Sequence, residues 1–77
     1  MEKVVRVINW LMEELIKNNR GYALIHLCCN ISEGEFKIYL DGQQIATITK
    51  DGCIFNFPLT HKQIAELYSI TGGRHDG

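Results

Sequence analysis

Residues 36–57, FKIYLDGQQIATITKDGCIFNF, decide the fold of this chain. Two Asp-Gly dipeptides, Asp41-Gly42 and Asp51-Gly52, separate short runs of β-branched and aromatic residues, and each dipeptide is a strong signal for a tight hairpin turn. The segment therefore predicts an antiparallel β-meander. Because such a sheet must bury at least one face, we expect the helix-like segments at the two ends of the chain to cover it.

The register after each turn decides which side chains share a face, because a slip of one residue inverts a strand. The first turn is predicted to contain two residues and to pair Ile38 with Ile45. The second is predicted as a three-residue loop, residues 50–52, with Gly52 in a left-handed bulge position. This loop places on the core face, with Ile45, the residues Cys53, Phe55 and Phe57. The reverse face then carries Leu24, Tyr39, Ala46, Ile48 and Ile54.

Residues 2–18 predict the longest helix, because their apolar side chains recur at helical spacing. The centre of the apolar stripe is Val4, Ile8, Leu11 and Leu15, with Val5, Met12 and Ile16 on one flank and Val7 on the other. The apolar arc covers roughly half the circumference, which is wider than one packing surface requires. We therefore expect this helix to contact more than the sheet, and Gly21 is suited to the left-handed position after its end.

The remaining segments complete the order α-β-β-β-β-α. Residues 22–31 predict a long strand whose core row is Ala23, Ile25, Leu27, Cys29 and Ile31. Pro58 ends the last strand, and Thr60 is a good N-cap for a short helix from His61 to about Ser69. That helix is predicted to direct inward Ile64, Ala65 and Leu67 or Tyr68. The fold class is α+β: one domain over residues 1–71, with a three- to four-stranded meander, followed by a disordered tail over residues 72–77.

The composition excludes several classes of protein. With 77 residues the chain can form one small core, and 45% hydrophobic and 22% charged residues are ordinary for a folded domain. Eight Lys plus Arg against nine Asp plus Glu give a net charge of -1, so no overall charge attracts nucleic acid or an anionic membrane. No apolar run indicates a signal peptide or a membrane span, so we expect a cytoplasmic protein without membrane contact.

The sequence predicts neither a cofactor nor an enzyme. Cys28, Cys29 and Cys53 are an odd number without a CxxC pair, and we expect reduced, buried thiols with no disulfide and no structural zinc. His26 and Cys28 could share a strand face with Cys53 or His61 nearby, but this spacing matches no standard zinc pattern. A thiol-imidazole pair would also need an orienting group and an oxyanion site, and neither is visible in the sequence.

Trp10 lies outside the apolar arc of the first helix, among charged residues, on the side expected to face water. Aromatic residues are enriched in the centres of protein interfaces, so Trp10 is a candidate anchor for a partner. Alternatively, it lies over the aliphatic stems of neighbouring Lys and Arg side chains. The predicted partner-binding residues are Trp10, Arg6, Glu14, Tyr39, Ile48 and Ile54.

The order of one helix, three or four strands and a second helix resembles the double-stranded-RNA-binding domain and the small HicA-type toxin ribonucleases. The resemblance implies phosphate contacts near the start of the second helix, where this chain has His61 and Lys62, with Lys50 as a further candidate. The HicA-type catalytic histidine is expected early in the sheet, and it has no clear counterpart in this chain unless His26 serves. Residues 59–71 also resemble the first helix and turn of a helix-turn-helix, but the recognition helix does not follow.

These features favour a small non-enzymatic protein-binding domain, a homodimer, that acts as an inhibitor, adaptor or regulator. The wide apolar arc, Trp10 and the semi-apolar reverse face support this hypothesis. Size and layout suggest a phage or mobile-element accessory protein of the anti-defence type. The alternative is a nucleic-acid-binding module.

Overall fold

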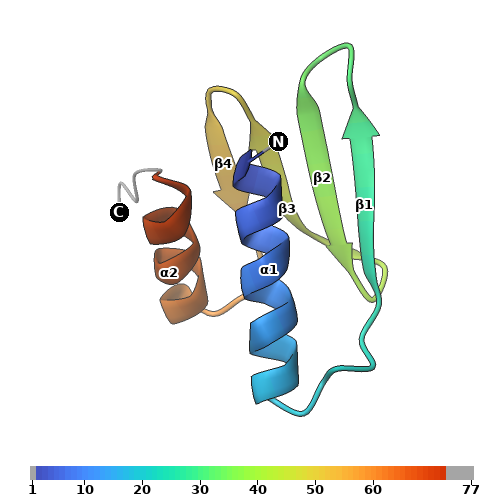
Figure 1. The fold of residues 1–77 in the computed structure, drawn as a ribbon, viewed down its shortest axis with the longest axis vertical. Coiled ribbons are helices and arrows are strands. Elements are labelled where there is room, and N and C mark those ends of the chain that lie inside the picture. Colours follow the sequence, from blue (N-terminus) through green and yellow to red (C-terminus); the bar gives the residue numbers. More distant parts are fainter. Residues whose placement is uncertain (1, 73–77) are drawn as a thin grey trace.

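The computed structural model describes residues 2–72 and has the predicted element order. Its elements are α1 (Glu2–Lys17), β1 (Ile25–Asn30), β2 (Glu35–Leu40), β3 (Gln43–Thr49), β4 (Gly52–Phe55) and α2 (His61–Thr71). The strands form one antiparallel sheet in the order β1-β2-β3-β4. Helix α1 lies in front of the sheet, and α2 packs beside α1 and next to β4 (Figure 1). The predicted α+β meander is confirmed.

Helix α1 packs on the sheet through one stripe of side chains at the spacing of an amphipathic helix. The buried residues of the stripe are Val4, Val7, Leu11 and Leu15. Val7 was predicted at a flank, but it is buried because α2 packs against α1. Ile8, predicted at the centre, is half-buried. The other flank is uncovered, and its exposed apolar residues are Val5, Met12 and Ile16.

The left-handed residue after α1 is Asn19, and the prediction that Gly21 takes this position is wrong. Asn19 has a φ of 59°, and the N–H of Arg20 donates to the C=O of Leu15 at 2.6 Å, which closes the last turn. Asn can take this role because its short polar side chain makes local hydrogen bonds in the left-handed region. The left-handed position therefore comes two residues earlier than predicted, and the helix ends at Lys17, one residue before the predicted end.

The first hairpin turn forms as predicted. Asp41 and Gly42 have φ values of 51° and 84°, and two positive φ values in a two-residue turn are those of type I′. The Asp41 carboxylate also accepts hydrogen bonds from the backbone N–H of Leu24 at 3.0 Å and from the guanidinium of Arg20 at 3.1 Å. The turn between β2 and β3 thereby holds the chain segment that leads into β1.

A β-bulge in β3 changes the register beyond that turn. Ile38 pairs with Ala46 and not with Ile45 as predicted, so Ile45 is the extra residue on β3. Its carbonyl accepts a hydrogen bond from the N–H of Asn56 at 2.8 Å, which keeps the bulged backbone paired. Because of the bulge, Ala46 and Ile48 lie in the core beside Ile45, and their predicted place on the reverse face is wrong.

The second hairpin has a two-residue loop, residues 50–51, in place of the predicted three-residue loop, because Thr49 pairs directly with Gly52. The extra residue expected in this loop lies in β3 instead. The two errors cancel along the chain, since each moves the later residues by one position. Cys53 and Phe55 are therefore buried on the core face, as predicted.

The chain leaves the sheet after β4. Phe57 was predicted in the core but is 77% exposed, because the strand ends at Phe55. Thr60 caps α2 as predicted: its hydroxyl accepts from the N–H of Gln63 at 3.2 Å, and the Gln63 side chain accepts from the N–H of Thr60 at 2.9 Å.

Helix α2 continues to Thr71, two residues past the predicted end, and Gly72 follows as a left-handed C-cap with a φ of 72°. Leu67 is buried and Ile64 and Tyr68 are half-buried, whereas Ala65, which was predicted to point inward, is exposed. Of the predicted tail, residues 73–77 lie outside the described part of the chain.

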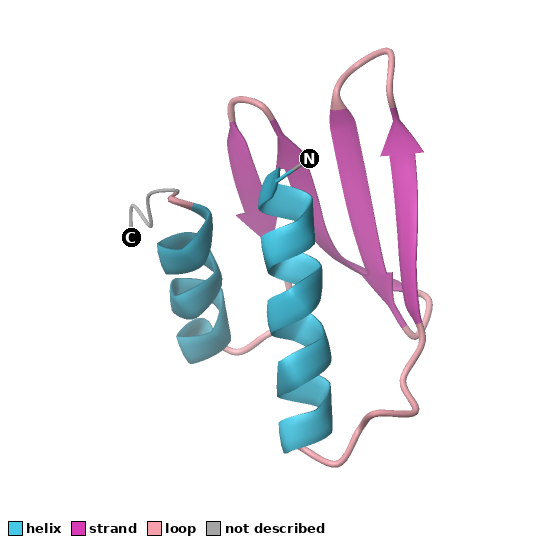
Figure 2. Cartoon of the chain, viewed as in Figure 1, coloured by secondary structure: helices cyan, strands magenta, loops and turns pink. Residues whose placement is uncertain are grey.

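The core lies between the two helices and the middle of the sheet. Its largest fully buried side chains are Ile38, Ile45, Leu67, Val4 and Val7. Strand β1 lies at the margin of this core: Ile25 and Leu27 are half-buried, but Ile31, from the same predicted row, is 85% exposed. Figure 2 shows β1 as an outermost strand, well to the side of α1.

The edge position of β1 also changes the environment of the cysteines. Cys53 is buried, as predicted, but Cys28 and Cys29 are exposed, so the prediction of burial is wrong for these two. A strand at the sheet margin cannot cover both of its rows, and a sequence pattern does not show whether a strand is central or at an edge.

Candidate interaction surfaces

The predicted partner-binding residues of α1 lie on the side of the helix toward α2. Trp10 is half-buried and packs against the core, with Pro58 nearby. The guanidinium of Arg6 donates to the C=O of Ile70 in α2 at 3.2 Å, and Glu14 is half-buried. Helix α2 therefore occupies part of the surface that we expected to face water. A role for Trp10 as a partner anchor stays a prediction.

The three predicted partner-binding residues of the sheet are separated by its two faces. Ile54 is exposed and Tyr39 half-buried on the reverse face, where the prediction placed them. Ile48 is only 2% exposed because the bulge in β3 directs it into the core. Ile48 cannot contact a partner of the folded domain, and this part of the prediction is wrong.

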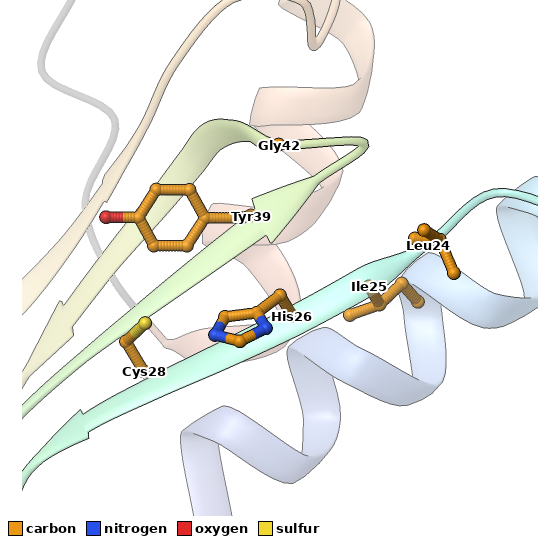
Figure 3. Close-up of a pocket in the computed structure, with 6 residues that line it drawn as sticks. All are labelled: Leu24, Ile25, His26, Cys28, Tyr39 and Gly42. Carbon is orange, nitrogen blue, oxygen red and sulfur yellow. The ribbon is translucent and has the colours of Figure 1, made fainter.

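A shallow hollow of about 500 Å³ lies along β1 and β2. It is lined by Leu24, Ile25, His26, Cys28, Tyr39 and Gly42 (Figure 3). His26 and Tyr39 are directly paired across the two strands, and their rings meet edge to face with centroids 6.1 Å apart. Within residues 2–72, no three His, Cys, Asp or Glu side chains come together as a set that could hold a metal ion. The predictions of no metal and no catalytic activity remain predictions.

The basic residues of the nucleic-acid alternative do not form one patch. His61 and Lys62 are exposed in the first turn of α2, and Lys50 is exposed in the turn between β3 and β4. Figure 1 shows the turn between β3 and β4 near the top of the domain, whereas α2 begins well below it. A contact of all three residues with one short stretch of phosphates therefore has no support from their arrangement.

The structure adds an apolar groove between α1 and the start of β1, which we call the α1–β1 groove. It has a volume of about 230 Å³ and is lined by Met12, Leu15, Ile16, Gly21, Ala23 and Ile25. Met12 is 50% and Ile16 66% exposed, so the walls of the groove are open to solvent. The wide apolar arc of the first helix was the signal for this surface. The sequence did not show which flank of that helix α2 would leave uncovered.

Comparison of the chain with protein-family models, with curated proteins and with solved structures finds no match. Across the described residues, neither helix has the length and apolar character needed to cross a lipid bilayer.

Proposed function

We propose that this chain is a small non-enzymatic protein-binding domain that takes a partner in the α1–β1 groove and also forms a homodimer. One observation supports this function above all. The flank of α1 that α2 leaves bare, with Met12 and Ile16, lies beside the half-buried Ala23 and Ile25, so apolar surface is continuous from the helix to the strand. Grouped apolar surface of this kind marks protein-contact sites on soluble domains.

The lining of the groove indicates the chemistry of the partner. Its six residues are apolar or glycine, so a partner would insert aliphatic or aromatic side chains and would gain nothing from charge in the groove. Met12 lies at its open wall, and an unbranched thioether adapts to differently shaped side chains.

A domain of this kind acts by occupying a surface of its partner, as an inhibitor, adaptor or regulator. We propose a cytoplasmic setting as a phage or mobile-element accessory protein of the anti-defence type, on the basis of size and layout alone.

The test compares two exposed isoleucines in affinity capture from the native host, followed by mass spectrometry. Ile16→Glu places a charge in the groove, whereas Ile54→Glu places the same charge on the reverse face, so Ile54→Glu is the matched control. A protein retained by the wild type and by Ile54→Glu but lost with Ile16→Glu would support the proposal. Loss with Ile54→Glu alone would move the binding site to the reverse face.

Nucleic-acid binding is the outcome that would overturn the proposal. Gel-shift titrations with duplex RNA, duplex DNA and single strands at two salt concentrations measure it directly. Tight binding that falls steeply with added salt, and that Lys62→Glu abolishes, would assign the domain to nucleic acid. We expect no such complex, because Lys50 lies in the turn between β3 and β4 and Lys62 in the first turn of α2, and these two elements are set apart in the fold.

A further inference from the structure

The two edges of the sheet differ in how they are protected. Strand β4 has only four residues, and the hydroxyl of Tyr68 in α2 donates to the backbone C=O of Cys53 at 3.1 Å. Short length and a cover over backbone groups are two ways in which proteins prevent an edge from pairing with another chain. Strand β1 has six residues, and within the described chain only β2 pairs with it. Its sequence, IHLCCN, contains no Pro or Lys that would block pairing.

The direction of the backbone groups in β1 follows from one hydrogen bond at its start. The N–H of Asp41 donates to the C=O of Leu24 at 2.9 Å, so the backbone of Leu24 faces β2. Backbone groups alternate in direction along an antiparallel strand. The N–H and C=O groups of Ile25, Leu27 and Cys29 therefore point away from β2, to the free edge.

The free edge of β1 fits a second copy of itself in the antiparallel direction. Such pairing brings the start of β1 in one copy next to the end of β1 in the other. Leu24 at the start is 74% exposed and Ile31 just past the end is 85% exposed, and a two-fold axis through the middle of the strand would place the second copy's strand beside each of them, once in each copy. Because β1 has no charged residue, the symmetry brings no like charges together along the strand.

We propose that two copies of this chain associate through antiparallel pairing of their β1 strands, which joins the two sheets into one continuous sheet. This inference rests on the proposed self-association and specifies its geometry. A single short strand on each side gives a contact at the small end of the range for specific complexes, so the dimer should dissociate at micromolar concentrations.

Amide hydrogen exchange of the wild-type protein, read by NMR at low and high protein concentration, tests the geometry residue by residue. In the monomer the N–H groups of Ile25, Leu27 and Cys29 exchange fast. At a total concentration about ten times the dissociation constant, their exchange should slow by about fivefold, as the monomer fraction falls. The N–H groups of His26 and Cys28 face β2 and should change little, so they are an internal control on the same strand.

Substitutions in sedimentation equilibrium give the second measurement. Cys29→Pro removes an outward N–H without touching the ladder to β2, and Cys29→Lys places a charge at the edge; both should give monomers with unchanged circular dichroism. Ile54→Lys on β4 is the matched control and should stay dimeric.

Three results would overturn the inference, and they separate it from the proposed function. A wild-type protein that is monomeric at all concentrations refutes β1 pairing and self-association. It does not bear on partner binding in the α1–β1 groove, which the capture experiment tests separately. A dimer that survives both Cys29 variants, or that protects no outward amide of β1, shows that self-association uses another surface. Protection that appears only when a different protein is added identifies β1 as an edge for a partner strand and refutes pairing between copies.

Discussion

Replacing Asp41 with alanine should destabilise the domain by about 2 kcal/mol, a large fraction of the stability of so small a domain. The loss has three parts in the structure. Asp41 has a φ of 51°, which lies in the left-handed region, and a residue such as alanine is less stable there by about 1 kcal/mol. Its hydrogen bond from the N–H of Leu24 contributes about 1 kcal/mol. The ion pair with Arg20 is half exposed on both sides and adds only about 0.3 kcal/mol.

Related substitutions separate these contributions. Asp41→Gly removes the backbone cost and should lose only the two side-chain interactions, about 1 kcal/mol. Asp41→Asn keeps an oxygen acceptor and a residue that tolerates the left-handed region, so it should cost less than about 0.5 kcal/mol. Arg20→Ala, the control for the ion pair, should cost about as little.

Urea denaturation at low protein concentration measures these losses without a contribution from self-association. The thermal midpoint of Asp41→Ala should fall by about 8 to 16 °C, given about 4 to 8 °C per kcal/mol for a domain of this size. The reasoning would be refuted if Asp41→Ala unfolded within about 0.5 kcal/mol of the wild type, or if Asp41→Asn were as damaging as Asp41→Ala.

Three further outcomes follow from the described contacts. Thr60→Ala should lower the free energy of unfolding by about 1 kcal/mol in urea denaturation, because α2 loses its N-cap, whereas Thr60→Ser should be close to the wild type. Equal stability of all three proteins would show that the cap does not stabilise the domain. Trp10→Ala should lower the free energy of unfolding by about 2 kcal/mol because the indole is half-buried against the core, and Trp10→Phe should lose no more than half as much. An unchanged free energy of unfolding in Trp10→Ala would mean that the ring does not contribute to packing. Chelator and reductant should each leave the thermal midpoint unchanged, and a fall of more than about 5 °C with either would reveal a metal or a disulfide.

The elements of the fold could be predicted from the sequence where the signal is local. The turn at Asp41-Gly42 and the cap at Thr60 depend on residues within a few positions of each other, and both predictions are confirmed. The bulge at Ile45 could not be predicted in this way. It depends on a hydrogen bond to Asn56, eleven positions away, and on the burial of both Ile45 and Ala46.

The surfaces were harder to predict than the elements because they depend on how distant segments pack. The helical period showed that α1 has apolar residues on more than one side, but it did not show that α2 would lie toward Trp10 and leave Met12 and Ile16 bare. The alternating pattern of β1 likewise predicted correctly which row of side chains faces the core. Cys29 is nevertheless exposed because the strand is outermost, and Ile31 because it lies in the turn after the strand. Position within a sheet is a property of the whole fold.

The unequal edges of the sheet limit how far strand addition can go. Strand β4 has only four residues, and the Tyr68 hydroxyl covers one of its backbone carbonyls. Each chain would therefore offer one edge, that of β1, for pairing with another chain. In the pair proposed above both β1 edges would be occupied, so a third chain would find no free edge and assembly would stop at two copies. If the cover over β4 were lost, the proposed pair would have a free β4 edge at each end, and a second contact, through β4, could then link pairs into a linear polymer. The hydrogen bond of Tyr68 to Cys53 would therefore help to keep the proposed pair from growing into a fibre.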